Sequence, residues 1–193
     1  MNYEECKAEL EKRLKRSRFL HSVGVADTAA FLAERFGLDV EKARLAGLLH
    51  DCAREFSNDD MISEAEKRGI AIGDVERSMP LLLHAPLGAR RAEEIYGVKD
   101  ADILRAIERH TVGASGMTPL DKVIYFADMM EPTRDYPGVE ELRRAAREDS
   151  LDDMTLEGLS RSISFVVEKR HLIHPDTVIA RNELLLMKAG KEV

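Results

Sequence analysis

The chain has 193 residues, of which 44% are hydrophobic and 34% are charged. This length and balance predict a single domain over residues 1–193 with a sizeable core, and they exclude a disordered chain. The formal net charge of −7 argues against a nucleic-acid partner, because such binders need a broad basic surface to neutralise phosphates.

Helical periodicity dominates the sequence, and no stretch alternates as a strand would. Glycines and prolines fall between the periodic segments, and Ser57 and Asp100 are placed to cap helices. The fold class predicted is therefore all-α, with short connections and no repeat or linker that divides the chain. In chain order, the expected helices cover residues 3–14, 18–36, 40–50, 58–68, 85–96, 101–110, 119–130, 137–147, 151–171 and 176–188.

Four of the six histidines fall on the inward faces or at the ends of these expected helices. His21 lies on an apolar stripe of the second helix, which is the spacing of a core-facing surface. His50 ends the third helix and is followed directly by Asp51, while His110 ends a later helix and His84 precedes one. A single inward histidine is more often a hydrogen-bonded core residue than a ligand. Only several such histidines together indicate a metal site.

Asp128 follows an apolar run over residues 123–127. A buried carboxylate costs several kcal/mol unless it is paired or bound to a metal. A salt bridge to an arginine or a place on a solvent-facing edge would also account for it. Imidazoles and carboxylates that converge from separate helices form a set that divalent metals bind. The expected ligands are His21, His50, Asp51, His84, His110 and Asp128.

Several separate motifs carry a resemblance to known proteins. The order of the histidines and aspartates resembles the HD superfamily of metal-dependent phosphohydrolases. The stretches LLHAPLGA, ERHTVG, MTPLDKVIYFADMMEPTRDYPGV and IHPDTVIARN are more specific. Over nearly the whole chain they resemble the YqeK family of symmetrical diadenosine tetraphosphate hydrolases.

This resemblance implies a single HD-domain helical bundle that holds two divalent metal ions. Iron is the metal that the resemblance implies, and manganese, cobalt, nickel or zinc would be accepted by the same ligand types. The resemblance divides the ligands into His21, His50, Asp51 and Asp128 on one ion and His84 and His110 on the second, with Asp51 bridging.

The implied reaction is hydrolysis of diadenosine tetraphosphate to two molecules of ADP. Two ions about 3.5–4 Å apart lower the pKa of a bridging water, so that a metal-bridging hydroxide can attack an inner phosphorus atom. Asp51, Arg54 and Arg134 are the expected catalytic residues, the arginines by neutralising the leaving diphosphate. Arg54 stands where many HD-superfamily enzymes carry lysine, and arginine does not readily release a proton. His171 and His174 are then the titratable candidates for proton delivery, although His171, which follows the run EKR, better fits a solvated or helix-end histidine.

A nucleotide-binding wall is expected from residues near these motifs. Arg181 could instead stabilise the last helix electrostatically, and His174 with Pro175 could simply begin that helix. The expected substrate-binding residues are Lys122, Thr133, Arg134, His174, Thr177, Arg181 and Asn182.

Two other functions compete with this one. The same metal fold could cleave another nucleotide, such as a nucleoside monophosphate or a guanosine alarmone, because fold alone does not set the substrate. A non-catalytic helical nucleotide-binding or adaptor module would keep the histidines as core residues. The favoured partner is a small dinucleoside polyphosphate. No membrane span or secretory signal is expected, and the two cysteines suggest no disulfide framework, so we expect a cytoplasmic protein.

Overall fold

The computed structural model describes residues 1–190, and every regular element in that range is helical, as the sequence predicts. Two short 3-10 helices, η1 and η2, lie before helices α4 and α6 in the chain. The elements are α1 (Tyr3–Arg13), α2 (Arg16–Phe36), α3 (Val40–Leu49), η1 (Cys52–Glu55), α4 (Asn58–Lys67), α5 (Asp74–Ser78), η2 (Pro80–Leu83), α6 (His84–Glu94), α7 (Ala101–Arg109), α8 (Pro119–Met130), α9 (Val139–Glu148), α10 (Leu151–Glu168) and α11 (Pro175–Ala189).

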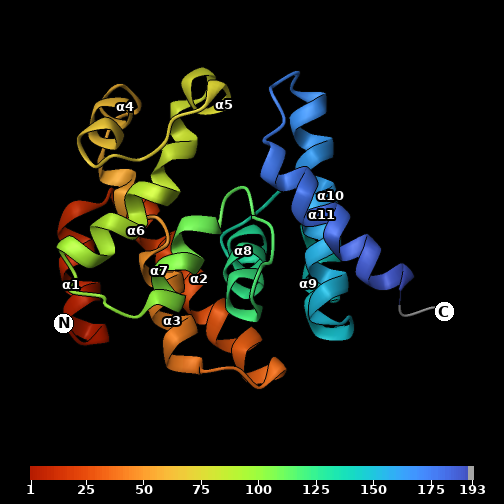
Figure 1. Cartoon of the computed structure of the whole chain (residues 1–193). Coiled ribbons are helices and arrows are strands. Elements are labelled where there is room, and N and C mark those ends of the chain that lie inside the picture. The colour runs from red at the N-terminus through yellow and green to blue at the C-terminus, as the bar shows by residue number, and fades with distance from the viewer. Residues whose placement is uncertain (191–193) are drawn as a thin grey trace.

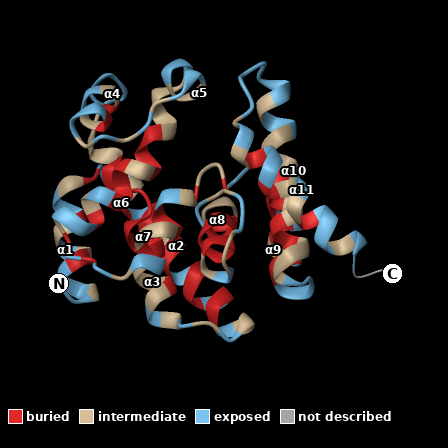
Figure 2. Cartoon of the chain, viewed as in Figure 1, coloured by how far each residue is buried: buried red, intermediate tan, exposed pale blue. Residues whose placement is uncertain are grey.

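Helix α8 lies in the middle of the molecule. It packs against α2, α3 and α7 on one side and against α9 and α10 on the other (Figure 1). All residues from 121 to 127 are buried (Figure 2). This part of the helix has no solvent-facing side, so its apolar run is continuous. The carboxyl-terminal end of α8 therefore carries Asp128 into the centre of the fold.

Helices α2 and α3 pack very closely, and this contact brings two of the expected ligands together. A Cβ atom at Gly47 would lie 3.0 Å from the Cα atom of Ala26 and 3.0 Å from the carbonyl oxygen of Val25. Only glycine fits at such a distance, so a larger residue would push the two helices apart. The close packing places His50, at the end of α3, beside His21 of α2.

Three apolar clusters hold the helices around this centre. The largest spans α1 to α10, and a second one, with Met61, Leu83 and Leu87, joins α4, η2 and α6. In the third, Tyr125 packs with Leu159 and with residues of α11, which fixes α10 and α11 against α8. None of the helices in the described range is long and apolar enough to cross a membrane.

The ten helices expected from the sequence are all present, with ends within about three residues of the expected positions. Ser57 and Asp100 cap α4 and α7 by accepting backbone hydrogen bonds, as predicted. Helix α5 and the two 3-10 helices were missed, because elements of four or five residues are too short to show a periodic pattern.

Candidate metal centre

Three helices bring the first group of expected ligands together. His21 comes from α2, His50 directly follows α3, and Asp128 lies in the last turn of α8. The Nε2 atoms of His21 and His50 are 3.2 Å apart. Oδ1 of Asp128 lies 2.9 Å from the first of these nitrogens and 3.7 Å from the second. We refer to His21, His50 and Asp128 as the first half of the centre.

A second pair of histidines lies across Asp51 from the first half. His84 begins α6 and His110 directly follows α7, and their Nε2 atoms are 3.1 Å apart. Oδ1 of Asp51 lies 3.2 Å from Nε2 of His84 and 4.0 Å from Nε2 of His110. We refer to His84 and His110 as the second half of the centre.

Asp51 connects the two halves. While its Oδ1 atom faces the second half, its Oδ2 atom lies 3.5 Å from Nε2 of His50 and 3.7 Å from Nε2 of His21. The side chain is almost fully buried, so its position is fixed by these neighbours. One carboxylate thus presents an oxygen to each half, which is the arrangement of a carboxylate that bridges two metal ions.

Each histidine is oriented by a hydrogen bond from its other ring nitrogen. Nδ1 of His50, His84 and His110 donates to the backbone carbonyl three residues earlier, at 2.7, 2.5 and 2.7 Å. Nδ1 of His21 lies 3.0 Å from Oε1 of Glu131, a carboxylate that is fully buried. These partners leave the four Nε2 atoms facing inward, as in metal-ligating histidines.

The donor set fits divalent metal ions. Groups of three of these side chains have ligand atoms within 4.8 Å of one another, in both halves. Imidazole nitrogens and carboxylate oxygens suit iron, manganese, zinc and related ions, whereas no thiolate is among the ligands. Cys52, next to Asp51, donates instead to the carbonyl of Gly88, and burial raises the pKa of its thiol.

The pKa shifts of these side chains favour neutral imidazoles and charged carboxylates, the forms that bind a cation. Burial lowers the pKa of His84, and it lowers the pKa of His110 to about 3 with a further contribution from neighbouring imidazoles. Burial alone would raise the pKa of Asp51, but the imidazoles, His50 foremost, hold it well below its usual range. The pKa of Asp128 is also depressed, since hydrogen bonds from the histidines of the first half outweigh burial.

Three arginines surround the two central carboxylates. Arg18 donates to Oδ2 of Asp51 at 2.7 Å, and Arg134 donates to Oδ1 of Asp128 at 2.5 Å. Arg54 is half-buried, and burial lowers its pKa while Asp51 and Asp128 act in the opposite direction. In a protein of net charge −7, these guanidinium groups form a local positive region beside the first half.

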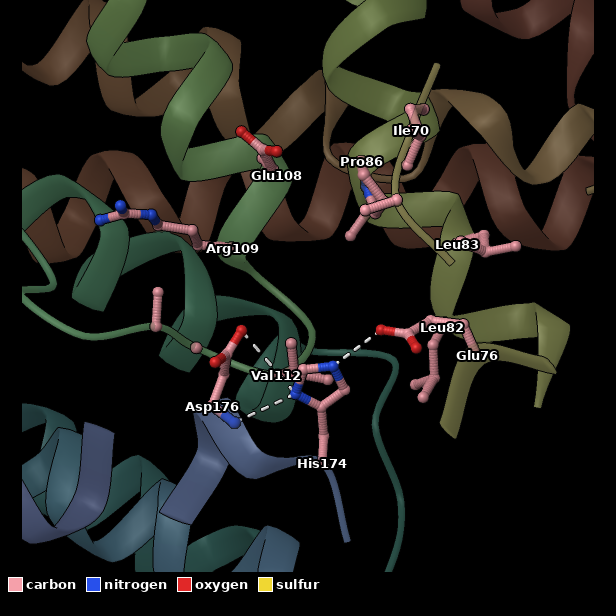
Figure 3. Close-up of a pocket in the computed structure, with 14 residues that line it drawn as sticks. Ile70, Glu76, Leu82, Leu83, Pro86, Glu108, Arg109, Val112, His174 and Asp176 are labelled. Carbon is pink, nitrogen blue, oxygen red and sulfur yellow. Dashed lines mark hydrogen bonds and ion pairs between the residues drawn. The ribbon is translucent and has the colours of Figure 1, made fainter. Parts of the chain in front are cut away.

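The expected substrate-binding residues fall into three groups. Thr133 and Arg134 lie beside the first half, in a cavity of about 280 Å³ that His21 and Arg18 also line. His174 lies in a different cavity, where its Nε2 atom is 2.8 Å from Glu76 (Figure 3).

The other four expected residues lie on α8 and α11. The ammonium group of Lys122 donates to Asp152 at 2.6 Å, which ties α8 to α10. Thr177 donates to the carbonyl of Val112 at 2.8 Å, and Arg181 donates to Ser160 at 2.9 Å. Asn182 is exposed on α11. The structure thus does not gather the expected substrate-binding residues at one place.

Three residues of the site were missed from the sequence: Arg18, Thr111 and Glu131. The hydroxyl of Thr111 lies 3.2 Å and 3.1 Å from Nε2 of His84 and His110. Arg18 stands one helical turn before His21, and Glu131 stands one turn after Asp128, so both share a helix face with a ligand. That spacing was the signal that could have identified them.

Known proteins are similar to this chain over most of its length. Residues 18–133 match the HD domain family. Two proteins named symmetrical bis(5'-nucleosyl)-tetraphosphatase, from Bacillus subtilis and Halalkalibacterium halodurans, are 41% and 37% identical, each over 96% of this chain and 98% of its own length.

A solved structure agrees with these relatives. The crystal structure of a Clostridium acetobutylicum protein, described as a predicted HD superfamily hydrolase involved in NAD metabolism, superposes with a TM-score of 0.91. It is 40% identical and covers 97% of this chain and 98% of that one. These similarities confirm the family expected from the sequence. The chain belongs to the HD-domain family and, within it, to the family of symmetrical bis(5'-nucleosyl)-tetraphosphatases.

Proposed function

We propose that this protein hydrolyses diadenosine tetraphosphate symmetrically to two molecules of ADP. The observation that carries the proposal is the position of Asp51, whose two carboxylate oxygens face two separate pairs of histidines. Such a carboxylate can hold two divalent ions side by side, and the relatives named above bear the name of this activity.

The first half and Asp51 would hold one ion, and the second half and Asp51 would hold the other, with iron as the expected metal. When bound, two such ions lower the pKa of a water between them and neutralise charge on a phosphoryl oxygen. The chain itself would supply the fixed ligand geometry, since each of the four histidines of the two halves has a hydrogen-bond partner at its Nδ1 atom.

The arginines would bind the phosphate chain. Arg18 and Arg134 donate to the carboxylates of Asp51 and Asp128, which would also bind the ions. Metal binding would therefore free these guanidinium groups to bind phosphate oxygens. Arg54 would add charge at the same place, because Asp51 and Asp128 lie close enough to affect its pKa. These three residues would neutralise the charge that develops on the leaving ADP.

The protein would act in the cytoplasm on a small molecule rather than on nucleic acid. Cys6 and Cys52 are both free and buried, as is common where thiols stay reduced. The net charge of −7 would weaken contact with a nucleic-acid backbone, and positive charge beside the centre is local.

A comparison of substrates tests this function against its alternatives. Anaerobically iron-loaded protein is incubated separately with diadenosine tetraphosphate, a nucleoside monophosphate, a guanosine alarmone and NAD. We expect the highest kcat/KM for diadenosine tetraphosphate. A higher value for any of the other three would replace the proposed substrate, whereas a metal content well below one ion per chain would favour the adaptor alternative.

A further inference from the structure

The turn that follows α8 carries two side chains that contact the first half of the metal centre. Glu131 lies 3.0 Å from Nδ1 of His21, and Arg134 donates to Oδ1 of Asp128 at 2.5 Å. Both side chains also line the cavity of about 280 Å³ beside the first half. We refer to residues 131–134 as the α8 turn. The position of its backbone sets how far both side chains reach toward the centre.

Side chains, rather than a glycine in the left-handed conformation, close the carboxyl-terminal end of α8. Its C-cap residue, Glu131, has an extended backbone, and the last carbonyl groups of a helix need donors from elsewhere. The carbonyl of Asp128 accepts from Nε of Arg134 at 2.8 Å. The carbonyl of Met130 accepts from Nε of Arg143 at 3.0 Å. Two arginines therefore donate to this helix end, one from the α8 turn itself and one from α9.

Arg143 makes two further contacts with the α8 turn. Its Nη2 atom donates to the carbonyls of Glu131 and Arg134, at 2.9 Å each. Its Nη1 atom pairs with the exposed Glu140, and a surface pair of this kind contributes little. The adjacent Leu142 is fully buried and anchors α9 in the largest apolar cluster. One guanidinium group on an anchored helix thus holds three carbonyls along the turn.

The two arginines have different parts under the proposed function. The guanidinium group of Arg134 would leave Asp128 to bind phosphate oxygens, so the carbonyl of Asp128 would lose that donor. The three bonds of Arg143 go to backbone carbonyls and would be kept. The α8 turn would therefore stay in place while Arg134 changes its partner.

We propose that Arg143 is a positioning residue for Glu131 and Arg134. By holding the backbone of the α8 turn, it sets the metal affinity of the first half and the reach of Arg134 toward phosphate. Arg143 itself would touch neither metal nor substrate. The part of the inference that concerns phosphate rests on the proposed function, whereas the part that concerns metal affinity does not.

Competition with a metal chelator tests the part that concerns metal affinity. Arg143→Ala should weaken the binding of one ion about ten-fold and leave the other unchanged, because Glu131 would no longer hold His21 in place. Arg144→Ala, at the neighbouring exposed arginine of α9, is the matched control and should bind both ions as the unaltered protein does. Equal weakening of both ions, or unchanged affinity for both, would overturn the proposal.

Arg143→Lys covers the case in which the alanine variant does not fold. Lysine keeps the positive charge but lacks the planar fork of donors that reaches several carbonyls at once. Arg143→Lys should therefore show the same selective loss of affinity for one ion. Full affinity for both ions in this variant would contradict the proposal, because a positive charge alone would then be sufficient.

A double-variant cycle tests the part that concerns phosphate, without turnover. Calorimetry at saturating metal concentration measures the affinity for ADP of the unaltered protein, Arg143→Ala, Arg134→Ala and the double variant. Each single change should lower the affinity about ten-fold. The double variant should bind ADP no more weakly than Arg134→Ala does, since Arg143 would act through Arg134.

Losses of ADP affinity that add up in the double variant would contradict this part, because Arg143 would then act independently of Arg134. If the unaltered protein does not bind ADP, the proposed function and the part that concerns phosphate both fail. The chelator competition still decides whether Arg143 supports the first half.

Discussion

The two sides of the metal centre use the same kind of ligand but have different surroundings. The first half is backed by the buried carboxylate of Glu131 and opens toward Arg18 and Arg134. In the second half, Nδ1 of each histidine contacts a backbone carbonyl instead, and the hydroxyl of Thr111 lies beside both Nε2 atoms. Two groups of similar side chains thus have different electrostatic surroundings, and the guanidinium groups of Arg18 and Arg134 lie beside the first half only.

The largest expected effect comes from the one side chain that both sides share. Asp51→Ala should abolish binding of both ions and hydrolysis, because the carboxylate faces both pairs of histidines. Metal analysis and turnover of diadenosine tetraphosphate measure this. Asp59→Ala, at an exposed position in the first turn of α4, is the control. An active Asp51→Ala variant with full metal content would remove the bridging role.

Removal of one ligand from a single half should have the next largest effect on metal content and activity. His21→Ala and His84→Ala should each reduce the metal content to about one ion per chain and sharply lower kcat, since each removes a ligand from one half only. Cobalt loading followed by absorption spectroscopy can show that the remaining ion differs between the two variants. Asp59→Ala, at an exposed position in the first turn of α4, is again the control. Loss of both ions in either variant would show that the halves do not bind independently.

Glu131→Gln tests whether the buried carboxylate of Glu131 supports metal binding by the first half alone. The carboxylate orients His21 through a 3.0 Å contact, and removal of such a partner typically costs about 10–100-fold in metal affinity. We expect one ion to bind more weakly in this variant and the other to keep its affinity, as measured by titration with a metal chelator. Glu140→Gln, on an exposed part of α9, is the control. Equal weakening of both ions would mean that Glu131 supports the fold rather than the first half.

The smallest effect is expected at the ion pair between Glu76 of α5 and His174, the N-cap of α11. Burial alone would raise the pKa of Glu76, but the bond to His174 lowers it below its ordinary value. A depressed carboxylate pKa contributes stability above the unfolded value of 4.5, and this contribution is lost as the pH falls through the folded value.

Glu76→Gln should therefore lower the free energy of unfolding by about 0.2–1 kcal/mol at pH 6, the range of partly exposed pairs. The deficit should shrink as the pH is lowered below 4. Chemical denaturation of metal-free protein at several pH values measures it, with Glu93→Gln on an exposed part of α6 as the control. A deficit that is independent of pH would mean that the carboxylate acts through packing rather than charge.

Sequence patterns predicted which histidines and aspartates cluster at the centre, because the chemistry of these side chains conflicts with their apolar surroundings. His21 interrupts an apolar stripe, and Asp128 follows a run that is buried throughout, so each needed a partner inside the fold. Helix ends at His50 and His110 were marked by the end of the periodic pattern. The fold class followed from the same periodicity, which ten helices display over enough residues to be recognised.

The surroundings of the ligands were less predictable because they depend on contacts between distant segments. Lys122 is paired with Asp152, thirty positions later in the chain, and no local pattern predicts that pair. His174 and Glu76 are 98 residues apart, and the short helix that carries Glu76 has no periodic signal. Arg18 resembles any charged residue on a solvated helix face until its distance to Asp51 is known.

The identity of the products shows whether the protein hydrolyses diadenosine tetraphosphate symmetrically. Anaerobically iron-loaded protein is incubated with diadenosine tetraphosphate, and the nucleotides are separated by chromatography. Symmetrical hydrolysis requires attack at one of the two inner phosphorus atoms, so ADP is expected as the sole product. AMP together with ATP, or no turnover in protein that carries its full metal content, would contradict it.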